Sequence, residues 1–125
     1  MILHEDDAVI IVNKPAGLLS LADRWAEDEP DLLTYARKYS GEAQLCHRLD
    51  KYTSGVLVIA KDPESYRFIS LQFQEREVLK YYLALCEGVH LYEEFMIDLP
   101  ISQGAKGRSK INQSSGKDAF TVVDT

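Results

Sequence analysis

The sequence predicts an α+β fold in which strands outnumber helices. Short runs of apolar, β-branched residues followed or preceded by turn residues recur along the chain, as in "AVIIVNK" at 8–14 and "VLVIA" at 56–60. Two other segments carry apolar residues at helical spacing. The 125 residues, of which 46% are hydrophobic and 27% charged, are enough for one globular domain.

In the first half of the chain, the strand at 8–14 is expected to end in a tight turn. The residue before a proline favours extended geometry, and Pro15 followed by Gly17 suits a type I turn. Asp31 is expected to cap a helix over "LLTYARKY" at 32–39, and Gly41 to end it. The apolar face of this helix holds Leu32, Tyr35, Ala36 and Tyr39.

In the second half, Asp62 and Pro63 predict the start of a helix that runs to about Glu75. Its buried side is expected to hold Tyr66, Phe68, Ile69, Leu71 and Phe73. The segment "EVLKYYLALCEG" at 77–88 is interpreted as a strand with side chains on alternate faces. Further strands are expected in "EEFMIDLPI", "GRSKIN" and "AFTVV", which follow in that order.

The charge of the chain is unevenly distributed. The net charge is −6, which lowers the expectation of a nucleic-acid partner because phosphate binding favours basic surfaces. Acidic residues gather in the first 31 positions, whereas the segment "AKGRSKINQSSGK" at 105–117 contains no acid. Since only the local field acts at a site, this segment can still present a basic face. Its four basic residues are Lys106, Arg108, Lys110 and Lys117.

Several classes of protein are not indicated. No run of 18 apolar residues predicts a membrane-spanning helix, and the acidic start of the chain is unlike a signal peptide. Cys46 and Cys86 are isolated, as in reduced cytoplasmic proteins. The three histidines have no metal-ligand spacing, and Ser54 lies in no GxSxG motif. No glycine-rich nucleotide-binding loop occurs in the sequence.

The segment "HRLDKYTSG" at 47–55 is the strongest candidate for chemistry. It places one carboxylate, Asp50, just before an apolar strand, where a sheet holds a loop still. The charges of His47 and Arg48 are expected to keep Asp50 ionised, so that it can act as a nucleophile or a base. The alternative is a structural aspartate in an Asx-turn or ion pair, with Thr53 and Ser54 bonding the backbone. The residues alone leave both interpretations open.

This segment resembles the active-site signature of the RluA-type pseudouridine synthases, HRLDxxTSG followed by an apolar strand. "ILHEDDAVIIVNKPAGLLS" is similar to that family's opening strand and NKPxG turn, "LQFQEREVLKYYLALCEG" to its helix and KxYxAxxxG, and "GKDAFT" to its GKxAxT. The four motifs occur in the family's order and cover nearly the whole chain. The resemblance implies a mixed, mostly antiparallel sheet with flanking helices and an active-site cleft across it.

The resemblance implies isomerisation of uridine to pseudouridine in structured RNA, ribosomal or transfer, without a cofactor or a metal. Asp50 would attack C1′ of the ribose or abstract a proton beside it. Tyr82 would pack against the uracil and assist proton removal from C5, and Arg48 would fill the stack left by an extruded uridine. Lys80 would pair with Asp50 or a phosphate, and the basic residues of 105–117 would contact the RNA backbone. The catalytic loop would be supported by His47, Leu49, Thr53, Ser54 and Gly55.

The sequence stops at Thr125, before the position of a further family motif similar to GRTHQIRxH. The arginine of that motif is expected to pair with the catalytic aspartate, and a buried carboxylate without its partner is destabilising. We therefore expect residues 1–125 to be the N-terminal portion of a catalytic domain, with little or no activity and no separate N-terminal RNA-binding module. A monomeric cytoplasmic protein is expected.

Two alternative functions stay open at this point. The first is a synthase-like module that binds RNA without converting it. The second is a glycosidase-like hydrolase, which would need a second carboxylate near Asp50, and the flanking sequence offers none closer than Asp62.

Overall fold

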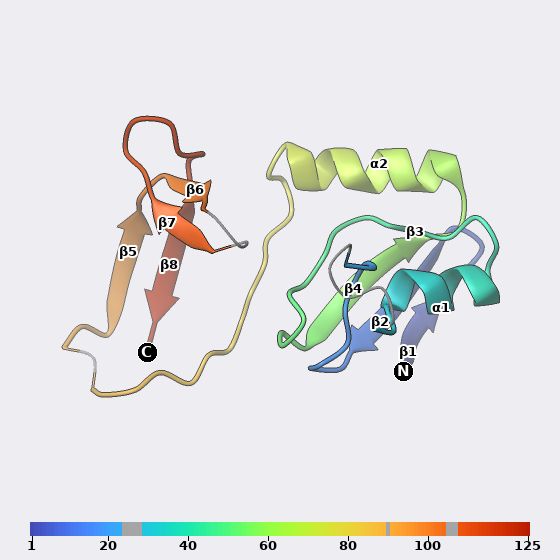
Figure 1. The fold of residues 1–125 in the computed structure, drawn as a ribbon, viewed down its shortest axis with the longest axis horizontal. Coiled ribbons are helices and arrows are strands. Elements are labelled where there is room, and N and C mark those ends of the chain that lie inside the picture. The colour runs from blue at the N-terminus through green and yellow to red at the C-terminus, as the bar shows by residue number, and fades with distance from the viewer. Residues whose placement is uncertain (24–28, 90, 105–107) are drawn as a thin grey trace. The chain divides into compact units, whose positions relative to one another are not determined.

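A four-stranded antiparallel sheet organises the first of two units, Met1–Tyr81. The structure, a computed structural model, describes residues 1–23, 29–89, 91–104 and 108–125. The strand order in the sheet is β1-β2-β4-β3, and every neighbouring pair is antiparallel (Figure 1). The elements of this unit are β1 (Ile2–Glu5), β2 (Val9–Lys14), α1 (Leu32–Tyr39), β3 (Gln44–Leu45), β4 (Gly55–Ala60) and α2 (Pro63–Gln74).

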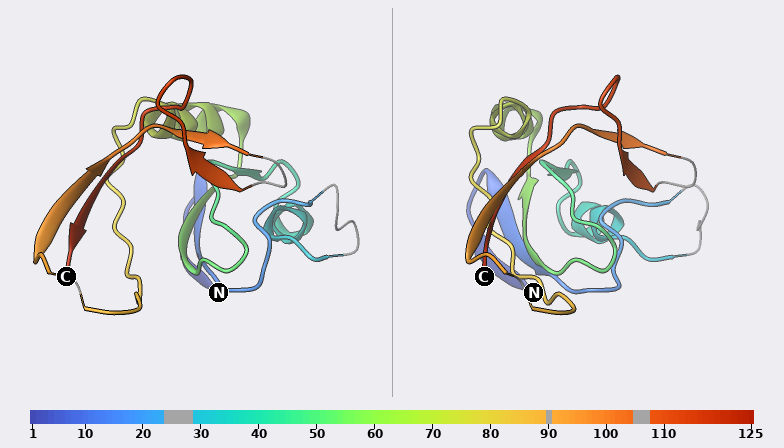
Figure 2. Two further views of the ribbon diagram at one scale, coloured as in Figure 1. Left: turned by 60° about the vertical axis from the view of Figure 1, so that its left-hand side comes forward. Right: turned by 90° about the vertical axis from the view of Figure 1, so that its left-hand side faces the viewer.

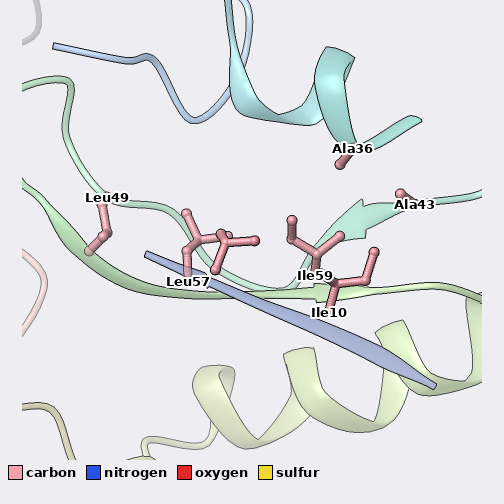
Figure 3. Packing of buried hydrophobic residues seen from close by; sticks show 7 residues of the cluster. Ile10, Ala36, Ala43, Leu49, Leu57 and Ile59 are labelled. Carbon is pink, nitrogen blue, oxygen red and sulfur yellow. The ribbon is translucent and has the colours of Figure 1, made fainter. Parts of the chain in front are cut away.

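The core of this unit lies on one face of the sheet. β2 and β4 form its centre, and Ile10 pairs with Ile59 while Val12 pairs with Leu57. Because side chains alternate along a strand, these four residues share a face. They pack with Ala36 of α1 and with Ala43 and Leu49, whereas α2 lies on the other side of the sheet (Figure 3). The strands predicted at 8–14 and 56–60 are confirmed.

Both predicted helices and their N-caps are confirmed. The carboxylate of Asp31 accepts a hydrogen bond from the backbone N of Thr34 at 2.9 Å. That of Asp62 accepts bonds from the backbone N atoms of Glu64 and Ser65, both at 2.9 Å. These bonds satisfy amides that have no partner in the first turn of a helix.

The predicted ends and buried faces of the helices need correction. Ser40, in extended geometry, is the C-cap of α1, and Gly41 does not adopt the positive φ of a glycine cap. Each helix buries fewer apolar side chains than their helical spacing predicts. A helix contacts a sheet along one line, so apolar side chains at the margins of its apolar face stay exposed. The side chains that were expected to be buried but are exposed are Tyr35, Tyr39, Phe68 and Leu71.

The second unit, Tyr82–Thr125, consists of two antiparallel strand pairs. β5 (Glu94–Asp98) pairs with β8 (Phe120–Asp124), and Figure 2 shows these strands side by side. β6 (Ile101–Gln103) pairs with β7 (Ser109–Ile111). The three strand segments predicted between 93 and 123 are confirmed as β5, β7 and β8, whereas β6, which begins at the last residue of the first segment, was not predicted. None of the described residues of this unit is buried.

The strand predicted at 77–88 is wrong. In the described part of the chain these residues pair with no other segment and lie between α2 and β5 without regular structure (Figure 1). Alternating side chains make a strand possible, but only a neighbouring strand can bond its amides and carbonyls. Tyr81 and Leu83, which an interior strand would bury, are exposed.

No helix of the described residues is long and apolar enough to cross a membrane.

Candidate active site

Asp50 lies on the loop between β3 and β4, and this loop is bonded to the one that follows β2. The backbone N of Gly17 donates to the carbonyl of Lys51 at 2.8 Å. The buried hydroxyl of Ser20 donates to the carbonyl of Leu49 at 2.6 Å and accepts from its backbone N at 3.1 Å. Leu49 also packs in the core. The backbone on either side of Asp50 is therefore fixed.

Lys14, the last residue of β2, is a fully buried lysine beneath these loops. Its Nζ donates to the carbonyl oxygens of Pro15 at 3.1 Å, Leu18 at 2.7 Å and Lys51 at 3.2 Å. Burial lowers the pKa of Lys14, and the negative charge of Asp50 opposes that shift. Lys14 thus supplies both a clamp for the two loops and a positive charge that acts on Asp50.

This role of Lys14 was not predicted from the sequence. The charges near Asp50 were assigned to His47 and Arg48 instead. A signal was present, because Ile10, Val12 and Lys14 alternate along β2 and so face the same side of the sheet.

Asp50 is exposed, so the expectation of a buried carboxylate is wrong. The backbone N of Thr53 donates to the carbonyl of Asp50 at 3.1 Å, which closes a four-residue turn. Among the described residues the carboxylate forms no ion pair and accepts no hydrogen bond, and Thr53 and Ser54 make no side-chain bonds to the backbone. The carboxylate is thus open to an incoming molecule, which favours a chemical role over a structural one.

His47 does not supply the positive charge that was expected beside Asp50. Its ring stacks on Phe73 of α2, with 4.3 Å between ring centroids, and its Nε2 accepts from the backbone N of Val58 at 3.2 Å. A nitrogen that accepts an N–H bond carries no proton, so the ring is neutral. Burial, followed by the positive charge of Lys80, lowers the pKa of His47. Its contribution is to hold the start of the loop that carries Asp50 on β4 and α2.

Folding stability is expected to decrease as the pH falls below 6.5, the ordinary pKa of histidine. Below this pH His47 binds a proton more readily in the unfolded chain than in the folded chain, because folding lowers its pKa. The free energy of unfolding therefore rises with pH, by at most about 1.4 kcal/mol per pH unit for one group. Urea unfolding at pH 5.5 and 7.5 measures this. His47→Gln, which keeps an acceptor but does not titrate, should lose less stability at pH 5.5. An equal loss in both proteins would contradict the prediction.

Gly55 begins β4 with a φ of 131°, a backbone conformation that residues other than glycine rarely adopt. A Cβ at this position would meet no atom within 4 Å, so the cost of substitution comes from the backbone alone. Gly55→Ala is expected to lower the free energy of unfolding by about 1–3 kcal/mol. Gly41→Ala is the matched control, because Gly41 has equally open space and no positive φ. Equal effects of the two substitutions in urea unfolding would exclude this explanation.

The other predicted site residues are distributed over both units. Arg48 and Lys80 are exposed in the first unit, and the charge of Lys80 acts on His47. Tyr82, 61% exposed, begins the second unit, so its predicted position beside Asp50 stays a prediction. Lys106 lies outside the described residues. Arg108, Lys110 and Lys117 are exposed on and beside the β6–β7 pair.

Comparisons with known proteins agree with the motifs. The RNA pseudouridylate synthase family matches residues 8–125. Dual-specificity RNA pseudouridine synthase RluA of Escherichia coli (strain K12) is 37% identical over 99% of this chain and 58% of the relative. The protein of the same name from Yersinia pestis is 36% identical over 97% of this chain and 60% of its own length. The chain thus spans less than two thirds of these relatives.

Two solved human structures share the fold. Human RNA Pseudouridylate Synthase Domain Containing 4 matches with a TM-score of 0.68 at 28% identity, over 97% of this chain and 51% of that one. Human RNA Pseudouridylate Synthase Domain Containing 1 matches with a TM-score of 0.72 at 23% identity, over 98% and 49% respectively, and this likeness concerns the fold alone. The expected α+β class with antiparallel sheets and flanking helices is confirmed. The chain belongs to the RNA pseudouridylate synthase family, as a member of its RluA type.

Proposed function

We propose that this chain carries the catalytic aspartate of an enzyme that isomerises uridine to pseudouridine in structured RNA, ribosomal or transfer. The observation that carries the proposal is the exposed carboxylate of Asp50, on a loop fixed by Lys14 and Ser20, in a chain of this family. A carboxylate that is open to solvent on a rigid backbone can meet the ribose of an extruded nucleotide without rearrangement.

The chemistry requires the bond between C1′ and N1 of uracil to break and a bond between C1′ and C5 to form. Asp50 either attacks C1′ or removes a proton beside it, and both steps need its carboxylate in the ionised form. After the uracil has turned and C5 has joined C1′, C5 loses its proton and N1 gains one. We assign assistance in the removal of the C5 proton to Tyr82, whose phenol can accept and donate protons.

Binding of the RNA is assigned to basic side chains of both units. Arg48, two residues before Asp50, would fill the space left by the extruded uridine, since a planar guanidinium both stacks and bonds phosphate. Contacts to the backbone of the RNA would come from Lys80, Lys106, Arg108, Lys110 and Lys117. We propose that the protein acts as a monomer in the cytoplasm.

Pseudouridine maps of ribosomal and transfer RNA test this function. Cells that lack the gene should lose pseudouridine at one or a few positions that cells with the gene modify. Unchanged maps would contradict the synthase and favour the RNA-binding module. Abasic sites at particular uridines, present only in cells with the gene, would instead favour a hydrolase.

A further inference from the structure

Tyr52 is an exposed aromatic residue on the same turn as Asp50. Its side chain is 79% exposed, and none of the steps proposed above uses it. The Nζ of Lys51 lies 5.7 Å from the centre of its ring, within the range of a cation–π interaction. That ammonium is held in turn by Glu29, whose Oε2 is 2.5 Å away.

The backbone that presents this ring is fixed. The carbonyl of Lys51 accepts hydrogen bonds from the backbone N of Gly17 at 2.8 Å and from Nζ of Lys14 at 3.2 Å. The turn is closed by the bond from Thr53 to Asp50. A tyrosine on such a backbone has only two side-chain torsions left to order, so it can bind a flat partner at a small entropic cost.

We propose that Tyr52 is a positioning residue that stacks on the nucleobase next to the reacting uridine. The inference rests on the proposed function, since it needs the uridine to be held at Asp50. Two residues of chain separate Cα atoms by at most about 7 Å, so the ring lies within reach of a nucleotide adjacent to that uridine. Unpaired RNA bases are commonly bound by stacking on exposed aromatic rings.

Binding and fluorescence of a labelled RNA test this inference with the full chain. The probe is an RNA stem-loop with one loop uridine and 2-aminopurine as its neighbour on the 5′ or the 3′ side, because stacking quenches 2-aminopurine. The wild-type chain should quench one of the two probes at saturation. Tyr52→Ala is expected to bind about 5- to 100-fold more weakly and to lose the quenching. Tyr52→Phe should behave as wild type, whereas Tyr52→Leu, which lacks a π-face, should behave as the alanine variant.

Tyr35→Ala is the matched control. Tyr35 is also an exposed tyrosine, and Nζ of Lys38 lies 5.9 Å from its ring, but it is on α1 and away from the turn. Its loss should change neither affinity nor quenching. If the wild-type chain binds RNA and Tyr52→Ala binds and quenches equally well, the inference fails and the proposed function stands. If the wild-type chain binds the RNA but quenches neither probe, the inference also fails, and the pseudouridine maps still decide the proposed function.

Discussion

Replacing Asp50 by asparagine is expected to abolish pseudouridine formation and leave the chain folded. The amide keeps the shape of the side chain but can neither attack C1′ nor remove a proton, so the rate should fall by about 10³-fold or more. Because Asp50 is exposed and accepts no hydrogen bond among the described residues, the substitution removes only its solvent-screened attraction to Lys14, and the free energy of unfolding should fall by less than about 1 kcal/mol. Cells that carry the Asp50→Asn allele should therefore lose the same pseudouridines as cells without the gene.

Asp7→Asn is the control for this substitution. Asp7 is also an exposed carboxylate of the first unit, in the turn between β1 and β2, and its change should leave the pseudouridine map intact. RNA binding by the Asp50→Asn protein should persist, since the cations assigned to the RNA remain. Full modification in the Asp50→Asn cells would remove Asp50 from the mechanism and leave its loop with a structural function only.

The local parts of this fold could be predicted from the sequence because their causes lie within a few residues. Asp31 and Asp62 bond amides two or three positions ahead, so a cap is visible in a short segment. The runs that form β2 and β4 are apolar enough to be buried wherever they pair. The loop that carries Asp50 was located through its motif, and the structure shows Asp50 exposed in that loop, between β3 and β4.

The parts that could not be predicted depend on partners far along the chain. β3 has only two residues and exists because Leu45 pairs with Ile59. β1 exists through pairing with β2, as between Ile2 and Val12. Conversely, 77–88 has the alternation of a strand and pairs with nothing that the structure describes. Register and pairing are properties of two segments together, and a pattern within one segment cannot supply them.

The buried ammonium of Lys14 was missed for the same reason. Its three acceptors, at Pro15, Leu18 and Lys51, come from two loops that only the folded chain brings together. Lysine is almost never fully buried unless its charge is paired or bonded, so the sequence alone favours an exposed side chain at this position. The alternation of side chains along β2 predicts that Lys14 faces the core, whereas the general tendency of lysine predicts that it is exposed. The packing of the two loops decides between them.

Lys14→Met is expected to lower the free energy of unfolding by about 2–4 kcal/mol, the largest stability effect we predict. Methionine fills a similar volume but cannot donate, so the carbonyls lose their bonds to Nζ. Lys51 keeps the bond from Gly17, whereas Nζ is the sole donor to Pro15 and Leu18 among the described residues. Replacing a buried charge by an apolar group is sometimes neutral. Here the acceptors are fixed backbone groups that stay behind, so we expect a net loss.

Urea unfolding and amide exchange of the full chain together test the role of Lys14. The exchange of the Gly17 amide should accelerate in Lys14→Met, because the bond that joins the two loops loses its support. Lys61→Met is the matched control: Nζ of Lys61 also bonds a carboxylate, Glu5, and a carbonyl, that of Asp6, but at the surface. That substitution should cost less than about 1 kcal/mol. If Lys14→Met costs no more than Lys61→Met and the Gly17 amide stays protected, Lys14 does not hold the loop that carries Asp50.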